Sequence, residues 1–160
     1  MPFIILLSLI SKPKSRSFFI AVTAVVIFAT WWLPHSLVFI LDGGHNEGCI
    51  KALRAMAEKY LKGKKLTFLI AFMKDKDYTS ALSDIAPMAE NIVFTLTDPI
   101  RGEAPEVLKT TAESYCKNVF SVCDPAEAYN KALSLSAEDS VLIVTGSFYL
   151  VSDIRNKLSQ

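Results

Sequence analysis

Five short runs of apolar residues recur between residues 37 and 160, and a helix-forming segment follows each run. Their lengths are typical of buried β-strands, which we predict at residues 37–41, 66–71, 91–96, 118–122 and 141–145. We predict the intervening helices at residues 46–62, 77–89 and 106–115, and from residues 125 and 147 onward. Strands that alternate with helices form a mostly parallel sheet with helices on both faces, so the predicted fold class is α/β.

Capping and turn residues mark the limits of several of these elements. Asn46 can cap the first helix, and Gly63 is expected to end it. Asp124 followed by Pro125 predicts the start of another helix, because aspartate caps a helix and proline suits its first position. Pro87 predicts a bend in the helix over residues 77–89.

Residues 1–36 form a hydrophobic leader that differs from the domain predicted over residues 37–160. Within it, residues 18–33 carry no charge and follow three basic residues, which is the layout of a signal peptide or signal anchor. Residues 3–10 are too few to span a bilayer. Two interpretations stay open: the leader is a membrane anchor through residues 18–33, or it is a frameshift remnant.

Charge and cysteine content exclude two classes of function. The net charge of +1 gives no electrostatic basis for binding nucleic acid. The three cysteines form no C-x-x-C pair and there are only two histidines, so we predict no metal site. The chain also has no G-x-x-x-x-G-K-[ST] or G-x-G-x-x-G sequence, so it lacks the standard loops that bind nucleotide phosphates.

Two loops follow predicted strands at the edge where parallel sheets bind ligands. In the first, Asp42 can accept hydrogen bonds from ribose hydroxyls, Gly43 and Gly44 permit a tight turn, and a neutral His45 can donate or accept a hydrogen bond. In the second, Ser147 begins a helix whose amino terminus favours anions. Each has a simpler alternative: Asp42 caps the turn, His45 is an exposed loop residue, and Ser147 is only a helix cap.

A third loop, at residues 74–77, follows the second predicted strand and reaches the same edge of the sheet. Its lysines and aspartates alternate in sign. The simpler interpretation of this run is a solvated turn without a ligand.

Three motifs, taken in order, resemble those of a known family. They are LDGGHN at residues 41–46, FMKDKDY at residues 72–78 and TGSFYLV at residues 145–151. Together they are similar to the carboxy-terminal domain of the folylpolyglutamate synthase/dihydrofolate synthase family, a branch of the Mur ligase superfamily. The resemblance covers about residues 37–158 and implies that family's carboxy-terminal α/β fold.

The resemblance implies an amide-forming reaction that uses ATP and Mg²⁺. The family phosphorylates a carboxylate of a folate or dihydropteroate, and the amino group of L-glutamate then displaces phosphate. By motif position, Asp42 would contact the ATP nucleoside, and His45 and Ser147 would lie near the incoming glutamate. The same resemblance implies that two loops contact substrate, and their candidate residues are Gly43, Gly44, Asn46, Lys74 and Asp77.

The chain also departs from the family pattern. The phosphate loop, magnesium ligands and folate-binding segments belong to a larger amino-terminal domain, and their motifs are absent here. A Trp-Pro-Gly-Arg motif with an ATP-contacting arginine normally precedes the first strand, whereas residues 31–36 read WWLPHS. We therefore expect a cytoplasmic fragment with little or no ligase activity alone, which a partner chain carrying the phosphate-loop domain could restore. The alternative is a membrane-tethered α/β module that binds a nucleotide or a partner without catalysis.

Overall fold

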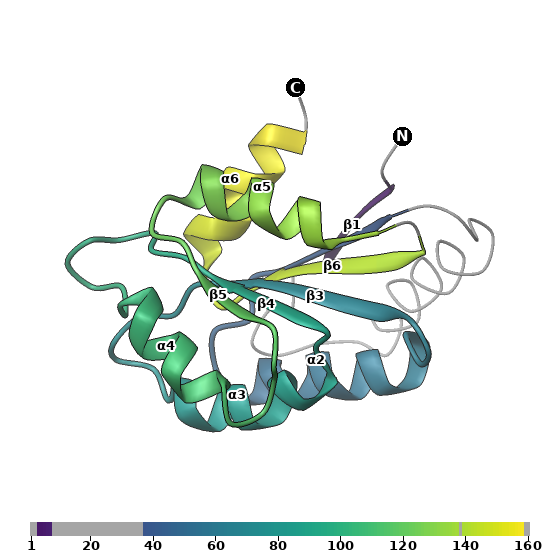
Figure 1. Ribbon diagram of the computed structural model, residues 1–160, viewed down its shortest axis with the longest axis horizontal. Coiled ribbons are helices and arrows are strands. Elements are labelled where there is room, and N and C mark those ends of the chain that lie inside the picture. The colour runs from purple at the N-terminus through teal and green to yellow at the C-terminus, as the bar shows by residue number, and fades with distance from the viewer. Residues whose placement is uncertain (1–2, 8–36, 138, 159–160) are drawn as a thin grey trace, which may run out of the picture.

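The computed structural model describes residues 3–7, 37–137 and 139–158 of the 160-residue chain. In these residues one sheet of six parallel strands has the order β1-β2-β6-β3-β4-β5 (Figure 1). The strands are β1 Phe3–Leu7, β2 Val38–Asp42, β3 Lys65–Ile70, β4 Asn91–Phe94, β5 Val119–Ser121 and β6 Ser140–Thr145. The five strands predicted between residues 37 and 160 correspond to β2 to β6, and the α/β fold class is confirmed.

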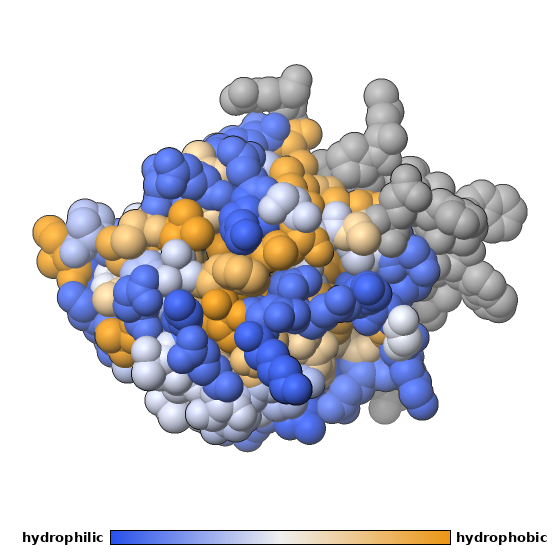
Figure 2. Space-filling model, in the orientation of Figure 1, coloured by the Kyte–Doolittle hydropathy of each residue, from blue (hydrophilic) through white to orange (hydrophobic). Residues whose placement is uncertain are grey.

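Helices cover both faces of the sheet. Figure 1 shows α2, α3 and α4 below the sheet and α5 and α6 above it. Their bounds are α2 Glu47–Tyr60, α3 Tyr78–Ile85, α4 Pro105–Ala112, α5 Pro125–Leu135 and α6 Phe148–Leu158. Figure 2, in the same orientation, shows hydrophobic residues along the middle of this face, between the hydrophilic residues of the two helical layers.

Two predictions about helix ends can be compared with the structure. Asn46 caps α2 by accepting a hydrogen bond from the Cys49 amide at 3.0 Å, as predicted. The helix predicted over residues 77–89 is α-helical only to Ile85, and the short 3-10 helix η1, Ala86–Met88, replaces its last turn. Pro87 accounts for the change, because it has no amide hydrogen to continue the α-helical pattern.

The predicted leader contributes one described element. β1 pairs in parallel with β2, with Phe3 opposite Val38, at the edge of the sheet. Residues 18–33, on which the anchor prediction rests, lie outside the described residues. None of the helices in the described ranges is long and apolar enough to span a membrane.

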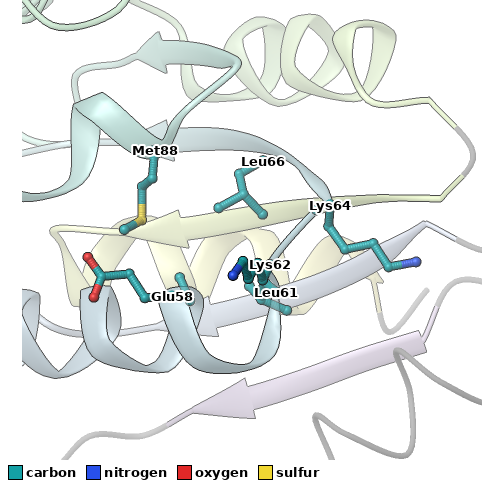
Figure 3. A pocket seen from close by; sticks show the side chains of 8 residues that line it. Glu58, Leu61, Lys62, Lys64, Leu66 and Met88 are labelled. Atoms are coloured by element: carbon teal, nitrogen blue, oxygen red, sulfur yellow. The ribbon is translucent and has the colours of Figure 1, made fainter.

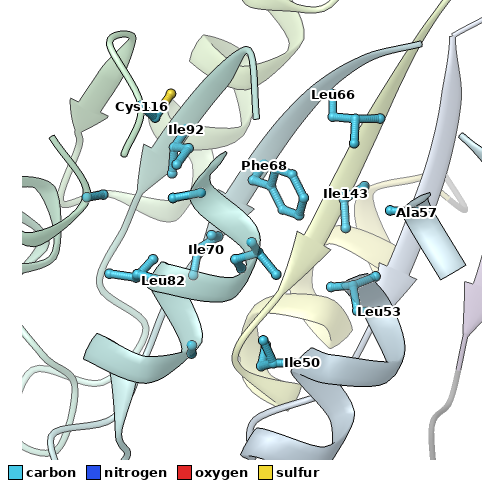
Figure 4. Close-up of a cluster of buried hydrophobic side chains, with 14 of the residues drawn as sticks. Ile50, Leu53, Ala57, Leu66, Phe68, Ile70, Leu82, Ile92, Cys116 and Ile143 are labelled. Carbon is cyan, nitrogen blue, oxygen red and sulfur yellow. The ribbon is translucent and has the colours of Figure 1, made fainter. Parts of the chain in front are cut away.

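Two buried clusters stabilise the layers. Because alternate side chains of a strand point to opposite faces, Ile143 of β6 packs on the side of α2 and α3, while Val144 packs on the side of α5 and α6. Figure 4 shows the first cluster, in which Phe68 and Ile70 of β3 face Leu53 and other residues of the lower helices. Each fully buried side chain of this size stabilises the fold by about 1.5–3 kcal/mol.

The strand order determines which loops meet at the carboxyl ends of the strands. β6 lies between β2 and β3, although it is the last strand in the chain. The chain leaves β2 for α2 in the lower layer and leaves β6 for α6 in the upper layer. Neighbouring strands whose helices go to opposite faces form a topological switch point, which is where ligands bind in open parallel sheets. The two loops predicted as a site therefore lie side by side.

Candidate functional site

Asp42 is the last residue of β2 and is fully buried. Its Oδ1 accepts a hydrogen bond from the Gly44 amide at 3.0 Å, which matches the turn-capping alternative for this residue. Its Oδ2 has no hydrogen-bond partner within the described part of the chain. Burial raises the pKa of Asp42 to about 7, and the Gly44 hydrogen bond only partly offsets this effect. One buried acceptor position is thus left over after the turn is capped.

The two glycines that follow Asp42 allow close contacts. A Cβ on Gly43 would lie 2.2 Å from Cε1 of Phe148, so the aromatic ring rests directly on this residue. A Cβ on Gly44 would lie 2.9 Å from Asp42 Oδ2. The Gly44 carbonyl also accepts a hydrogen bond from the Gly146 amide at 3.0 Å, which joins the loop after β2 to the loop after β6.

His45 is half-buried and lies at the entrance to α2. Its Nδ1 is 3.1 Å from the Gly43 carbonyl oxygen, and its ring centroid is 5.0 Å from that of Phe148. Because a carbonyl oxygen can only accept a hydrogen bond, Nδ1 carries the hydrogen in this contact. In the neutral ring, Nε2 is then left as a hydrogen-bond acceptor.

Ser147 follows Gly146, which has a positive φ of 90° and turns the chain from β6 toward α6. Ser147 is 3% exposed, and its carbonyl accepts a hydrogen bond from the Val151 amide in the first turn of α6. Its Oγ lies 3.5 Å from Oγ1 of Thr97, which belongs to the loop after β4. The hydroxyl therefore faces the loop after β4.

Lys74 and Asp77, the two candidate residues of the loop over residues 74–77, contact different parts of the structure. Asp77 caps α3 by accepting a hydrogen bond from the Ser80 amide, and it lines a cavity of about 160 Å³ together with His45 and Asn46. Lys74 instead donates through Nζ to the Ile100 carbonyl at 3.1 Å. The structure thus brings Asp77 to the first loop and directs Lys74 toward the loop after β4.

Two residues at this edge received no role from the sequence. Phe148 lies within the third motif, but nothing in its spacing predicted that it would cover Gly43 and contact His45. Thr97 lies in a loop without periodicity or motif, so no sequence signal pointed to its contact with Ser147. Both contacts depend on how separate loops meet in space.

The described residues offer no alternative site with obvious chemistry. A larger pocket of about 400 Å³ lies at the opposite end of the sheet, where α2 ends and β3 begins (Figure 3). It has an apolar floor that includes Leu61, Leu66 and Met88, with Glu58 and Lys62 at its rim. Across residues 3–7, 37–137 and 139–158, no group of three or more His, Cys, Asp or Glu side chains could hold a metal ion.

The chain matches one protein family over most of its length. Residues 32–148 match the family described as the Mur ligase glutamate ligase domain. The dihydrofolate synthase/folylpolyglutamate synthase of Bacillus subtilis (strain 168) is 26% identical over 118 residues. That alignment covers 74% of this chain and 27% of the Bacillus protein.

Two solved structures have a similar fold. The folylpolyglutamate synthase of Thermotoga maritima is 30% identical with a TM-score of 0.64, and the match covers 76% of this chain and 28% of that one. The bifunctional folylpolyglutamate synthase/dihydrofolate synthase of Yersinia pestis, complexed with AMPPNP and a Mn ion, is 20% identical with a TM-score of 0.64 and the same coverage. The chain therefore spans less than a third of the length of each relative.

Proposed function

This chain belongs to the Mur ligase family, whose glutamate ligase domain it carries, and from that premise we propose that it forms the carboxy-terminal part of an ATP-dependent ligase that joins L-glutamate to a folate. The resemblance of the chain to the folylpolyglutamate synthase/dihydrofolate synthase branch is confirmed by the Bacillus and Thermotoga relatives. The name of the Bacillus protein covers two synthase activities, and the proposed carboxylate accordingly belongs to a folate or to a dihydropteroate.

The proposed reaction forms an amide in two steps. ATP transfers its γ-phosphoryl group to the substrate carboxylate, which yields ADP and an acyl phosphate. The amino group of L-glutamate then attacks the acyl carbon, inorganic phosphate leaves, and a proton is lost from the nitrogen. Activation is needed because a free carboxylate is a poor electrophile in water.

The observation that carries this proposal is the convergence of the first and third motifs at one edge of the sheet. The Gly44 carbonyl is hydrogen-bonded to the Gly146 amide, and the ring of Phe148 contacts His45. Residues that are more than 100 positions apart in the sequence are thereby held within one loop cluster at the switch point. The family match makes a glutamate ligase site the best-supported use of this cluster.

Asp42 is proposed to contact the nucleoside of ATP through Oδ2. This buried oxygen has no partner among the described residues, so it could accept a hydrogen bond from a ribose hydroxyl or, when protonated, donate one. Gly44 lies against the carboxylate, since a Cβ there would be 2.9 Å from Oδ2. Because Asp42 is fully buried, contact with a nucleotide requires the glycine turn to move.

His45 is proposed to bind the incoming amino acid. Its Nε2 is left as an acceptor once Nδ1 donates to the Gly43 carbonyl, so it can accept a hydrogen bond from an ammonium group. Ser147, at the amino terminus of α6, can donate to a carboxylate of the same molecule, and the helix dipole favours that negative charge. His45 thus offers a hydrogen-bond acceptor for the amino group of the substrate, and Ser147 offers a donor for a carboxylate.

The divalent metal is assigned no residue in this chain. The Yersinia structure contains a Mn ion, but no acidic or histidine cluster in the described ranges could hold one. The sequence also lacks a phosphate-binding loop for the triphosphate. We therefore propose that this chain alone has little or no ligase activity.

The test is to assay the purified chain with ATP, Mg²⁺, L-glutamate and either folate or dihydropteroate. ADP release and glutamylated product are measured for the chain alone and after mixing with the Bacillus relative truncated before its matching domain. We expect product only from the mixture, and a loss of at least about tenfold with Ser147→Ala or His45→Ala. Rapid product formation by the chain alone would contradict the proposal.

A further inference from the structure

We propose that Thr97 is a further substrate-binding residue, and that its hydroxyl and that of Ser147 together bind one carboxylate of the incoming amino acid. This inference rests on the proposed function, because it specifies how the same site recognises its amino acid substrate. Neither the motifs nor the family match assigns a role to Thr97.

The geometry of the two hydroxyls supports a shared ligand. Oγ1 of Thr97 and Oγ of Ser147 lie 3.5 Å apart, which is longer than a normal hydrogen bond between hydroxyls. Each hydroxyl can donate one hydrogen, and a carboxylate has two acceptor oxygens. A carboxylate between the loops can therefore accept one hydrogen bond from each side chain.

The strand order explains why these two loops meet. β3 lies between β4 and β6, so the loops after β4 and β6 flank the carboxyl end of β3. Gly146 turns the chain directly over this end, since a Cβ on it would lie 2.5 Å from the Ala71 carbonyl oxygen. Thr97 is half-buried while Ser147 is 3% exposed, so Thr97 is the more accessible member of the pair.

The loop that carries Thr97 is held firmly. Asp98 accepts hydrogen bonds from the Ile100 and Arg101 amides at 2.9 Å each, and these bonds lower the pKa of its carboxyl. The same loop forms an isolated antiparallel bridge between Gly102 and Met73. A binding hydroxyl on a rigid loop loses little conformational entropy when its ligand arrives.

The charge around the hydroxyl pair also suits an anion. Ser147 precedes the 11-residue helix α6, whose first amide groups and dipole favour negative charge. The carboxylate of Asp98 is next to Thr97 in sequence, but its Oδ1 is already engaged by two backbone amides. The pair thus combines two neutral donors with a favourable field, a combination that suits a carboxylate better than an ammonium group.

The experiment titrates L-glutamate into the full chain and follows backbone amide NMR shifts at residues 145–149. Variants are Thr97→Val, which replaces the hydroxyl with a methyl group, and Thr97→Ser, which keeps the hydroxyl. The matched control is Thr110→Val, because Thr110 is exposed on α4 and bonds only its own helix. We expect glutamate binding about tenfold weaker for Thr97→Val and nearly unchanged for Thr97→Ser and Thr110→Val. Thermal unfolding of each variant verifies the fold, and Thr97→Ala replaces Thr97→Val if the latter does not fold.

Two results would overturn the inference. If Thr97→Val binds glutamate as well as the wild type while Ser147→Ala binds it weakly, Thr97 is not part of the site and the proposed function stands. If the wild-type chain binds no L-glutamate at concentrations on the order of tens of millimolar, the proposal that the two hydroxyls bind its carboxylate is wrong. The proposed function is then judged separately, by product formation in the mixture with the truncated Bacillus enzyme.

Discussion

At the scale of single residues, Asp42 is the most unusual group in the described structure. It is fully buried, with one oxygen bound to the Gly44 amide and the other left without a partner among the described residues. The sequence predicted its place at a strand end but could not predict this burial. The burial of Asp42 depends on Gly44, which lies against its carboxylate, and on the loop after β6, which approaches from a distant part of the chain.

This burial leads to a prediction about stability and pH. The pKa of Asp42 is raised from 3.8 to about 7 in the folded state, so the native state holds a proton that the unfolded state has released between these values. The free energy of unfolding should therefore fall as pH rises from about 4 to 7, by an amount on the order of 4 kcal/mol for this group alone. Asp42→Asn removes the charge and keeps an acceptor for the Gly44 amide.

The measurement compares urea unfolding of wild type and Asp42→Asn at several pH values. We expect the variant to become more stable relative to wild type as pH rises, with little further change above pH 8. Titration of the other groups is common to both proteins and cancels in the difference. A stability difference that stays constant from pH 4 to pH 8 would show that Asp42 does not titrate in this way.

At the scale of elements, most helices and strands could be predicted, because each depends on local pattern. Asn46 and Asp124 cap helices as expected, and every strand predicted between residues 37 and 160 is present. The site was predictable only in part. Asp42, His45 and Ser147 follow strands in recognisable motifs, whereas Thr97 and Phe148 reach these candidate residues through contacts between loops.

The close packing of Gly146, in the loop after β6, leads to a prediction about stability for which Gly63 provides the control. Gly146 and Gly63 both have a positive φ, of 90° and 85° respectively. An alanine forced into this conformation destabilises the fold by about 1–2 kcal/mol at either position. A Cβ on Gly146 would also lie 2.5 Å from a backbone carbonyl, while one on Gly63 would meet nothing within 4 Å. Gly146→Ala should therefore destabilise the fold by about 1–3 kcal/mol more than Gly63→Ala.

Chemical denaturation of the two variants measures this difference. Wild type at the same pH gives the reference for the free energy of unfolding. Equal losses for Gly146→Ala and Gly63→Ala would mean that the loop after β6 can move away from Ala71. The close approach of this loop to β3 would then be unimportant for stability.

At the scale of the whole molecule, the described residues form one α/β sheet with helices on both faces, and the chain belongs to the Mur ligase family, whose matched relatives are longer. Its match covers 27% of the Bacillus relative and 28% of the Thermotoga structure. The layered fold brings the two motif loops to one edge of the sheet, and the described residues include no metal-binding cluster. We propose that these residues supply an amino-acid-binding edge to a ligase whose phosphate chemistry resides on another domain.

The most direct test is a chimera in which residues 37–160 replace the matching domain of the Bacillus enzyme. Glutamylated product is measured against the amino-terminal part of that enzyme alone and against chimeras with Ser147→Ala or His45→Ala. We expect ligase activity well above that of the amino-terminal part, and a loss of at least about tenfold in each variant. A folded chimera with no activity above the amino-terminal part, or with activity unchanged in both variants, would contradict this proposal.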